Sequence, residues 1–207
     1  MKLKAIIACC LAGSVFAAGY AAAEQDLFRS KDAVIANEGK IGDRWMLAEG
    51  ATLAVPAYPA AFAQRGDDVC MALGYRINPD GSTSDFAVFK QWNSADGDKE
   101  PEAGYWEAFA NAGAEALAQW RFQPRPDARP VRPTYTVATL AFTGTNGPGG
   151  DIRANCKVED LAAAIQARKS KAYMKHSRDR AELDRANHAN NLRTMVESPR
   201  TLPRPAN

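Results

Sequence analysis

The stretch VCMALGYRINPDGSTSDFAVFKQW, residues 69–92, decides how this chain folds. Every second residue from Val69 to Ile77 is large and apolar, which is the period of a half-buried β-strand. The sequence Asn-Pro-Asp-Gly at residues 78–81 follows, in which proline presets one turn dihedral and glycine supplies conformational freedom. The chain should therefore fold back as an antiparallel hairpin, with a returning strand from about Thr83 to Trp92.

A polar loop separates this hairpin from a stretch with the period of a helix, from Glu102 to Trp120. Apolar and small residues recur there at steps of three and four, and they form a stripe wide enough to cover a small sheet. Gly113 lies in this stripe, where glycine costs about 1 kcal/mol relative to alanine but would let the sheet approach closely. Pro124 and the prolines after it prevent the helix from continuing. We expect this segment to be the core helix.

The end of the predicted helix, Trp120-Arg121-Phe122, places two large aromatics around one arginine. At helical spacing such aromatics are typical of a core, so we expect Trp120 and Phe122 to pack against the sheet. Arg121 should point to solvent or to the last carbonyls of the helix. This conspicuous stretch is therefore predicted to be structural.

Two further elements flank these. Residues 134–144, TYTVATLAFTG, are rich in threonine, valine and aromatics and predict a closing strand. Pro59 suits the first position of a helix and Gly66 its end, which predicts a helix of one or two turns. Residues 24–54 show no steady period and are expected to be irregular. This order of predicted helices and strands indicates an α+β domain over residues 55–156, with a small three-stranded antiparallel sheet packed against one main helix.

The two ends of the chain are expected to lie outside this domain. Residues 1–23 resemble an export signal, with Lys2 and Lys4, an apolar stretch and small residues before a predicted cleavage after Ala23. A retained membrane anchor is the alternative, because the uncharged run approaches the roughly 20 residues that span a bilayer. Residues 157–207 predict a charged helical tail with a disordered end.

Charge is distributed unevenly along the chain. Loss of Lys2 and Lys4 would leave equal numbers of basic and acidic residues, yet residues 157–207 carry 11 basic and 6 acidic ones. Because acids are interspersed among these cations, the tail lacks the clustered, unopposed charge that a nucleic-acid backbone requires. We expect no nucleic-acid partner.

Cys70 and Cys156 remain after the predicted cleavage. An even count in an exported chain predicts one disulfide between them. In the chain-entropy model, closing a loop of that length stabilises by about 4 to 5 kcal/mol. Two buried free thiols are the alternative, since free cysteine is often buried.

The residues for catalysis are few. His176 and His188 lie far apart in the polar tail and do not form a plausible metal pair. The sequence has no nucleophile elbow and no glycine motif for nucleotides. The acidic pairs Asp67-Asp68 and Asp96/Asp98 are typical of solvated loops, because calcium loops need a longer alternation of oxygen ligands. We expect no enzymatic activity, no cofactor and no bound metal.

Four stretches, in this order and with these gaps, resemble the C-terminal domain of the TonB energy-transducer family. The resemblance covers Val55 to Gly144, less than half of the chain. The matching stretches are YPAAFAQRG at 58–66, VCMALGYRINPDGS at 69–82, AEALAQWRFQP at 114–124 and PVRPTYTVATLAF at 130–142.

The resemblance implies a periplasmic protein that binds outer-membrane transporters through an exposed sheet edge. A short transporter peptide adds there as a further strand, so backbone hydrogen bonds supply affinity and alternate side chains supply selectivity. Tyr58 would belong to a segment with additional contacts, around Val55 to Pro59. The alternative is a purely structural strand whose edge is protected by the tail or by a second copy of the chain. The edge residues implied are Thr134, Tyr135, Thr136, Val137, Ala138, Thr139 and Leu140.

The chain departs from the family in two ways. Its N-terminal segment resembles a cleavable signal rather than an anchor, and no long proline-rich spacer precedes the domain. We therefore expect a periplasmic protein-binding module, with a protein or peptide partner such as an outer-membrane receptor. Two alternatives remain: a shortened, membrane-anchored energy transducer, and an envelope structural protein working through its basic tail on an acidic partner or membrane surface. Homodimerisation through the sheet edge is a further expectation that the sequence leaves open.

Overall fold

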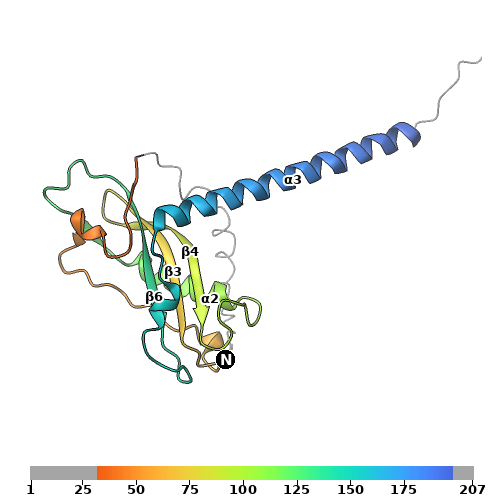
Figure 1. Cartoon of the computed structure of the whole chain (residues 1–207). Helices are drawn as coiled ribbons and strands as arrows, with labels where there is room; N and C mark the ends of the chain where they lie inside the picture. The colour runs from red at the N-terminus through yellow and green to blue at the C-terminus, as the bar shows by residue number, and fades with distance from the viewer. Residues whose placement is uncertain (1–31, 198–207) are drawn as a thin grey trace, which may run out of the picture. The chain divides into compact units, whose positions relative to one another are not determined.

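The computed structural model describes residues 32–197, with side chains for residues 32–185 (Figure 1). The predicted signal and the predicted disordered end from 198 lie outside the described residues. The chain divides after Ala162 into two compact units. The first unit holds the sheets and the core, and the second is built from the C-terminal helix.

The main sheet has four strands in the order β1-β6-β3-β4. The central strand β3 (Val69–Ile77) pairs antiparallel with β4 (Thr83–Asn93) and with β6 (Thr134–Phe142). These are the three strands that the sequence predicts. The fourth strand, β1 (Val34–Ile35), pairs parallel with β6 and corrects the three-stranded expectation. A strand of two residues has no period that a sequence pattern could reveal.

A second, two-stranded sheet joins a strand from before the predicted domain to one within it. It pairs β2 (Trp45–Leu47) with β5 (Phe122–Pro124), and a 3-10 turn, η1 (Ile41–Asp43), precedes β2. Within the described part of the segment expected to be irregular, residues 32–54, only β1, η1 and β2 are regular elements. Trp45 explains why this segment is ordered, because its ring is buried and its Nε1–H donates to Thr134 Oγ1 at 2.8 Å.

The hairpin turn between β3 and β4 is fixed by its own polar groups. Ser82 donates from both its backbone N–H and its hydroxyl to Asp80 Oδ1, at 2.9 and 2.6 Å. These hydrogen bonds hold the pKa of Asp80 below its ordinary value. Gly81 has a φ of 83°, and a Cβ there would lie 1.7 Å from the Phe122 carbonyl oxygen. The turn therefore requires glycine for both conformation and space.

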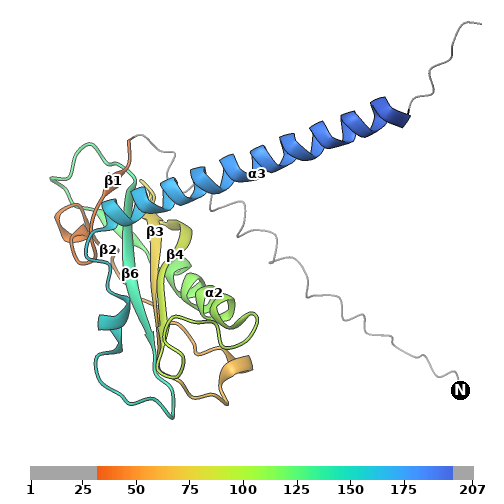
Figure 2. The ribbon, with the colours of Figure 1, turned by 45° about the vertical axis from the view of Figure 1, so that its right-hand side comes forward.

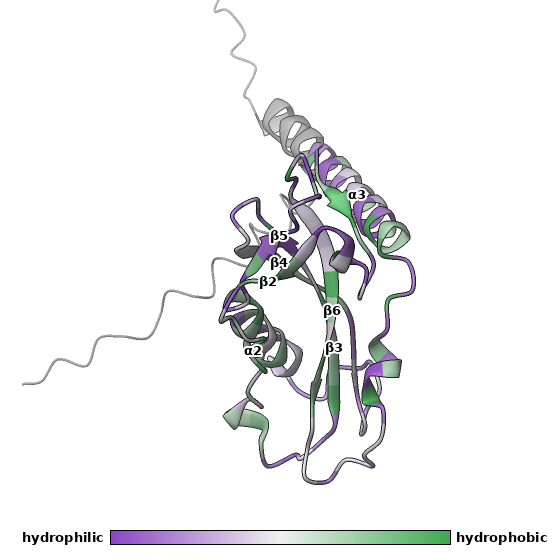
Figure 3. Cartoon of the chain, turned by 90° about the vertical axis from the view of Figure 1, so that its left-hand side faces the viewer, coloured by the Kyte–Doolittle hydropathy of each residue, from purple (hydrophilic) through white to green (hydrophobic). Residues whose placement is uncertain are grey.

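The core helix, α2 (Tyr105–Ala118), covers one face of the main sheet, and the 3-10 segment η3 (Ile152–Cys156) lies on the other (Figure 2). Figure 3 shows hydrophobic residues along β3 and β6 between these two layers. A Cβ on Gly113 would lie 2.5 Å from Leu73 Cδ1 and 2.9 Å from Leu140 Cδ1. The glycine in the apolar stripe thus permits the close approach of helix and sheet that the sequence suggests.

The end of α2 follows the prediction. Trp120 and Phe122 are buried, and Trp120 Nε1–H donates to the Ala54 carbonyl oxygen at 2.9 Å. Arg121 turns back and donates to the Ala118 carbonyl oxygen at 2.7 Å. Phe122 begins β5. The predicted helix near Pro59 is a single 3-10 turn, η2 (Ala60–Phe62).

Cys70 and Cys156 form a disulfide, as predicted, across 86 residues of sequence. The bond attaches η3 to β3 on the face of the sheet that α2 does not cover. Both cysteines are fully buried.

The C-terminal helix, α3 (Leu161–Glu197), is 37 residues long and matches the predicted helical tail. Its first N–H, on Leu161, donates to the side-chain oxygen of Asn37 at 3.0 Å. Among residues 32–197, no helix combines the length and the apolar character needed to cross a bilayer.

Candidate functional site

The edge of β6 that faces away from β3 is the site that the sequence predicts. The N–H and C=O of one strand residue point to the same side, and this side alternates along the strand. The carbonyl of Tyr135 accepts from Ala36, and the N–H of Thr139 donates to Glu38, so both face away from β3. The backbone groups of the odd-numbered residues from 135 to 141 therefore form the outward edge of β6, while those of the even-numbered residues point toward β3.

Strand β1 occupies the beginning of this outward edge. Val34 pairs with Thr134 and Ile35 with Tyr135, in parallel. The Val34 N–H donates to the Pro133 carbonyl and the Ala36 N–H to the Tyr135 carbonyl, both at 2.9 Å. This corrects the expectation of an exposed edge: at the beginning of β6 the chain's own residues already make the backbone contacts that an added strand would need.

Glu38 covers a second point on the same edge. One of its carboxylate oxygens accepts from the Thr139 N–H at 2.6 Å, and the other accepts from the Thr139 hydroxyl at 2.7 Å. A carboxylate that accepts two such donors makes charge-assisted bonds, which are shorter and stronger than neutral ones. Residues 33–38, which we call the edge segment, therefore hold β6 at two places.

The side chains of the predicted edge residues are all buried. Ala138 and Leu140 belong to the core beneath α2. Tyr135 packs with Ala87 on the opposite face, with Ala33 and Phe89 against them. A partner at this edge would consequently contact the backbone of β6 and the borders of its side chains.

Tyr58 does not join this edge. Its hydroxyl donates to the Asp67 carbonyl at 3.2 Å, and its ring meets Phe109 edge-on at 5.0 Å. Asp67 lies just before β3 begins, whereas Thr134 pairs with Ile77, where β3 ends. The predicted contact residue and the start of the predicted edge are therefore at opposite ends of the sheet.

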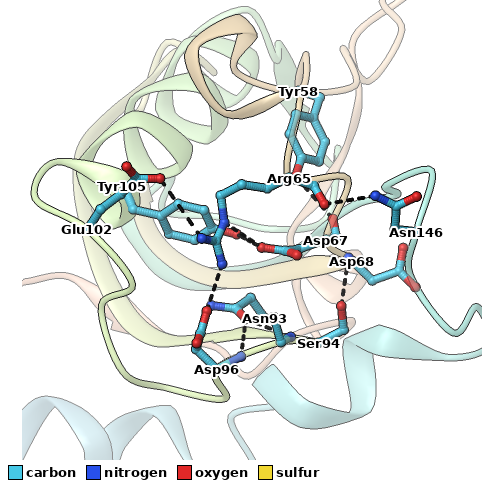
Figure 4. A network of polar contacts seen from close by, with 11 residues as sticks. Tyr58, Arg65, Asp67, Asp68, Asn93, Ser94, Asp96, Glu102, Tyr105 and Asn146 are labelled. Carbon is cyan, nitrogen blue, oxygen red and sulfur yellow. Dashed lines mark hydrogen bonds and ion pairs between the residues drawn. The ribbon is translucent and has the colours of Figure 1, made fainter.

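Figure 4 shows the polar network around Tyr58, which is centred on Arg65. Its guanidinium contacts Asp67 at 2.8 Å and Asp96 at 2.7 Å. Tyr105 donates its hydroxyl to the same Asp67 carboxylate at 3.2 Å. Burial, followed by the negative charge of Asp67, raises the pKa of both Tyr58 and Tyr105 above the ordinary tyrosine value. The network joins the loop before β3 to the start of α2.

Asp67 and Asp68 are buried, which corrects the expectation that this pair is solvated. Asp68 accepts from the backbone N–H of Gly144 and of Gly149, each at 3.0 Å. A Cβ on Gly147 would lie 2.0 Å from the Asp68 carboxyl carbon, so the glycine-rich loop wraps closely around this carboxylate. Within residues 32–185, no three histidine, cysteine or acidic side chains meet in a way that could hold a metal ion.

Strand β4 forms the opposite edge of the main sheet. Its pairing with β3 has two register shifts, and Asp85 there has a φ of 55°. Lys90 is exposed and donates to the Lys157 carbonyl at 2.7 Å. Irregular pairing and lysine are features by which proteins protect sheet edges from added strands. The more regular β6 is the better candidate to receive one.

No family model matches this sequence, and neither does any curated protein. Among solved structures, the solution NMR structure of the Pseudomonas aeruginosa TonB C-terminal domain is similar in fold. The two chains are 18% identical, the alignment covers 52% of this chain and 92% of that one, and the TM-score is 0.39. Values this low carry no argument about this chain, so the argument about the site comes from the sheet itself.

Proposed function

We propose that this chain is a non-catalytic protein-binding module of the bacterial envelope that receives an extended peptide as an added strand on the outward edge of β6. The expected partner is an envelope or outer-membrane transport protein. Backbone hydrogen bonds supply the affinity in this mode, and alternate side chains supply selectivity.

The observation that carries the proposal is the pairing of β1 with β6. A segment of only two paired residues lies extended along this edge and donates hydrogen bonds of 2.9 Å from Val34 and Ala36. An isolated pair of short strands is marginally stable in water, so this pairing supports an edge that favours an extended backbone. Strand β6 continues beyond this contact to Phe142.

The Cys70–Cys156 disulfide supports export to the periplasm. Disulfides form and persist in oxidising compartments and are rare in the cytosol. The bond fixes η3 on the face of β3 that α2 leaves uncovered, so it belongs to the folded body rather than to a mobile end. Export also fits the predicted N-terminal signal.

A matched pair of proline variants tests the proposal. Val137 faces outward on β6, so Val137→Pro removes one N–H from the candidate edge and none from the ladder with β3. Gln91 shares the outward side of β4 with Asn93, whose N–H donates to the Gly97 carbonyl away from β3. Gln91→Pro therefore makes the same change at the opposite edge and is the control.

The readout is photo-crosslinking in cells from a photoreactive residue at Ala141, which is half-buried at the end of β6. We expect a cross-link to an extended segment of an envelope protein, at least tenfold weaker in Val137→Pro and unchanged in Gln91→Pro. Thermal unfolding checks that both variants fold. Cross-linking that Val137→Pro leaves intact, or that both prolines reduce equally, would contradict the proposal.

A further inference from the structure

The edge segment, residues 33–38, suggests what the partner looks like. Resting on the function proposed above, we infer that this segment is an internal stand-in for the ligand: the partner is an acidic extended peptide parallel to β6, and it competes with the chain's own residues. The acidic residue of the peptide lies three residues after the residue that pairs with Tyr135, as Glu38 lies three residues after Ile35.

Thr139 provides the acidic preference. Its N–H and its hydroxyl converge on the two oxygens of one carboxylate, at 2.6 and 2.7 Å. A carboxylate accepts both donors in charge-assisted bonds, whereas an amide can accept only one of them, and only as a weaker neutral bond, with its NH₂ donating to the hydroxyl instead. Because the N–H belongs to the outward edge itself, a carboxylate there also fixes the register of the added strand.

The side chains of the edge segment indicate the remaining preferences. Val34 and Ala36 are half-buried, whereas Ile35 is 42% exposed. Ala33 packs against the pair formed by Tyr135 and Ala87. The peptide should therefore have a small residue at the position of Ala33, whose side chain packs against Tyr135, and a β-branched residue at the position of Val34. It should also have a small residue at the position of Ala36, two residues before the acid.

The segment is positioned to compete because it belongs to the same chain and Asn37 holds it near its C-terminal end. Asn37 accepts from the Leu161 N–H at 3.0 Å and donates to the Glu159 carbonyl at 3.2 Å. A segment held in the same chain acts at an effective concentration of about millimolar. The apparent affinity of an added peptide is then its intrinsic affinity multiplied by the fraction of molecules in which the edge segment has left β6. Loosening the edge segment should consequently strengthen peptide binding.

The experiment uses the full-length oxidised chain and a fluorescent peptide that copies residues 32–40, DAVIANEGK. Ala36→Pro removes the N–H that donates to Tyr135, and Glu38→Gln weakens the contact with Thr139. We expect the peptide to bind each variant at least tenfold more tightly than the unchanged chain. Glu49→Gln, which alters an exposed glutamate after β2, is the matched control and should leave the affinity unchanged.

A second peptide with glutamine in place of its glutamate tests the acidic preference. We expect it to bind the Ala36→Pro variant about tenfold more weakly, as loss of a charge-assisted contact implies. Equal affinity of the two peptides would overturn the carboxylate preference, and equal binding to the unchanged chain and the variants would overturn the competition. Both results would leave strand addition to be judged by the Val137→Pro and Gln91→Pro cross-linking.

Discussion

At the scale of single residues, the buried polar groups carry more structural weight than the sequence suggests. Asp68 is 1% exposed, and its carboxylate holds the loop after β6 through two glycine N–H groups. The sequence indicated that acids at this place are solvated, because a pair of neighbouring aspartates has no pattern that distinguishes a loop surface from a loop anchor. The partner of Asp68 is backbone, which no side-chain motif can reveal.

Replacing this anchor should destabilise the fold. Asp68→Ala leaves the Gly144 and Gly149 N–H groups without their carboxylate, and we expect a loss of about 2 to 3 kcal/mol in the free energy of unfolding. Asp98→Ala, at an exposed aspartate, is the control and should change it by less than about 0.5 kcal/mol. Urea unfolding measures both. Equal effects of the two substitutions would show that Asp68 does not hold the loop.

The buried tyrosines predict a pH dependence. Burial raises the pKa of Tyr58, Tyr75 and Tyr105 above about 10, the ordinary value. Above that pH the unfolded chain loses these protons while the folded chain keeps them, so the contribution of these tyrosines to stability is constant below pH 10 and falls as pH rises above it. Phenolate absorbance should therefore appear at higher pH in the folded chain than in urea. Coincident titrations in the two conditions would refute this.

At the scale of elements, the sequence predicts those with a long period and misses the short ones. Strand β3 matches its predicted bounds, and β4, β6 and α2 differ only at their ends. Each of them repeats an apolar position several times, which averages out local exceptions. Strands β1, β2 and β5 have two or three residues, and tertiary contacts such as the Trp45–Thr134 hydrogen bond determine them.

The candidate site depends on one of these short elements. The sequence places the predicted edge residues on a single strand, as found. It could not show that Val34, Ile35 and Glu38 reach that strand, because about a hundred residues of chain separate them from it. The pair of β-branched residues at 34–35 was the only signal, and it is too short to distinguish a strand from a loop.

The contact between α2 and the main sheet gives a test at this scale. Gly113→Val should place side-chain atoms against Leu73 and Leu140 and destabilise by about 1 to 3 kcal/mol through overpacking. Ala118→Val, at an exposed position of the same helix, controls for the helix propensity of valine. Urea unfolding of the two variants measures the difference. Similar stabilities would mean that the helix can move away from the sheet at little cost.

At the scale of the whole molecule, one covalent bond attaches the C-terminal part of the body to the sheet. The Cys70–Cys156 disulfide joins residues 86 apart and secures η3 on the face opposite α2. The pairing was predictable because only two of the four cysteines lie beyond the predicted signal, and two cysteines allow one connectivity. The position of η3 on the second face of the sheet was not predictable, because η3 has no apolar period.

Removing this bond should lower stability but leave the strand order of the sheet unchanged. Reduction, or the double variant Cys70→Ala and Cys156→Ala, is expected to lower the free energy of unfolding by about 2 to 5 kcal/mol. Urea unfolding with and without reductant measures the loss in the unchanged chain. The double variant is the control for the reductant, because its stability should not respond to it. A reductant-independent transition in the unchanged chain would contradict the prediction.

The central claim is that the outward edge of β6 accepts an extended strand. Residue-resolved amide hydrogen exchange in the Ala36→Pro variant, with and without the DAVIANEGK peptide, tests it most directly. The account predicts that the peptide slows exchange of the outward-facing Val137 N–H at least tenfold and leaves that of Gln91, on the outward side of β4, unchanged. Protection that appears at Gln91 instead, or a bound peptide that protects neither strand, would contradict it.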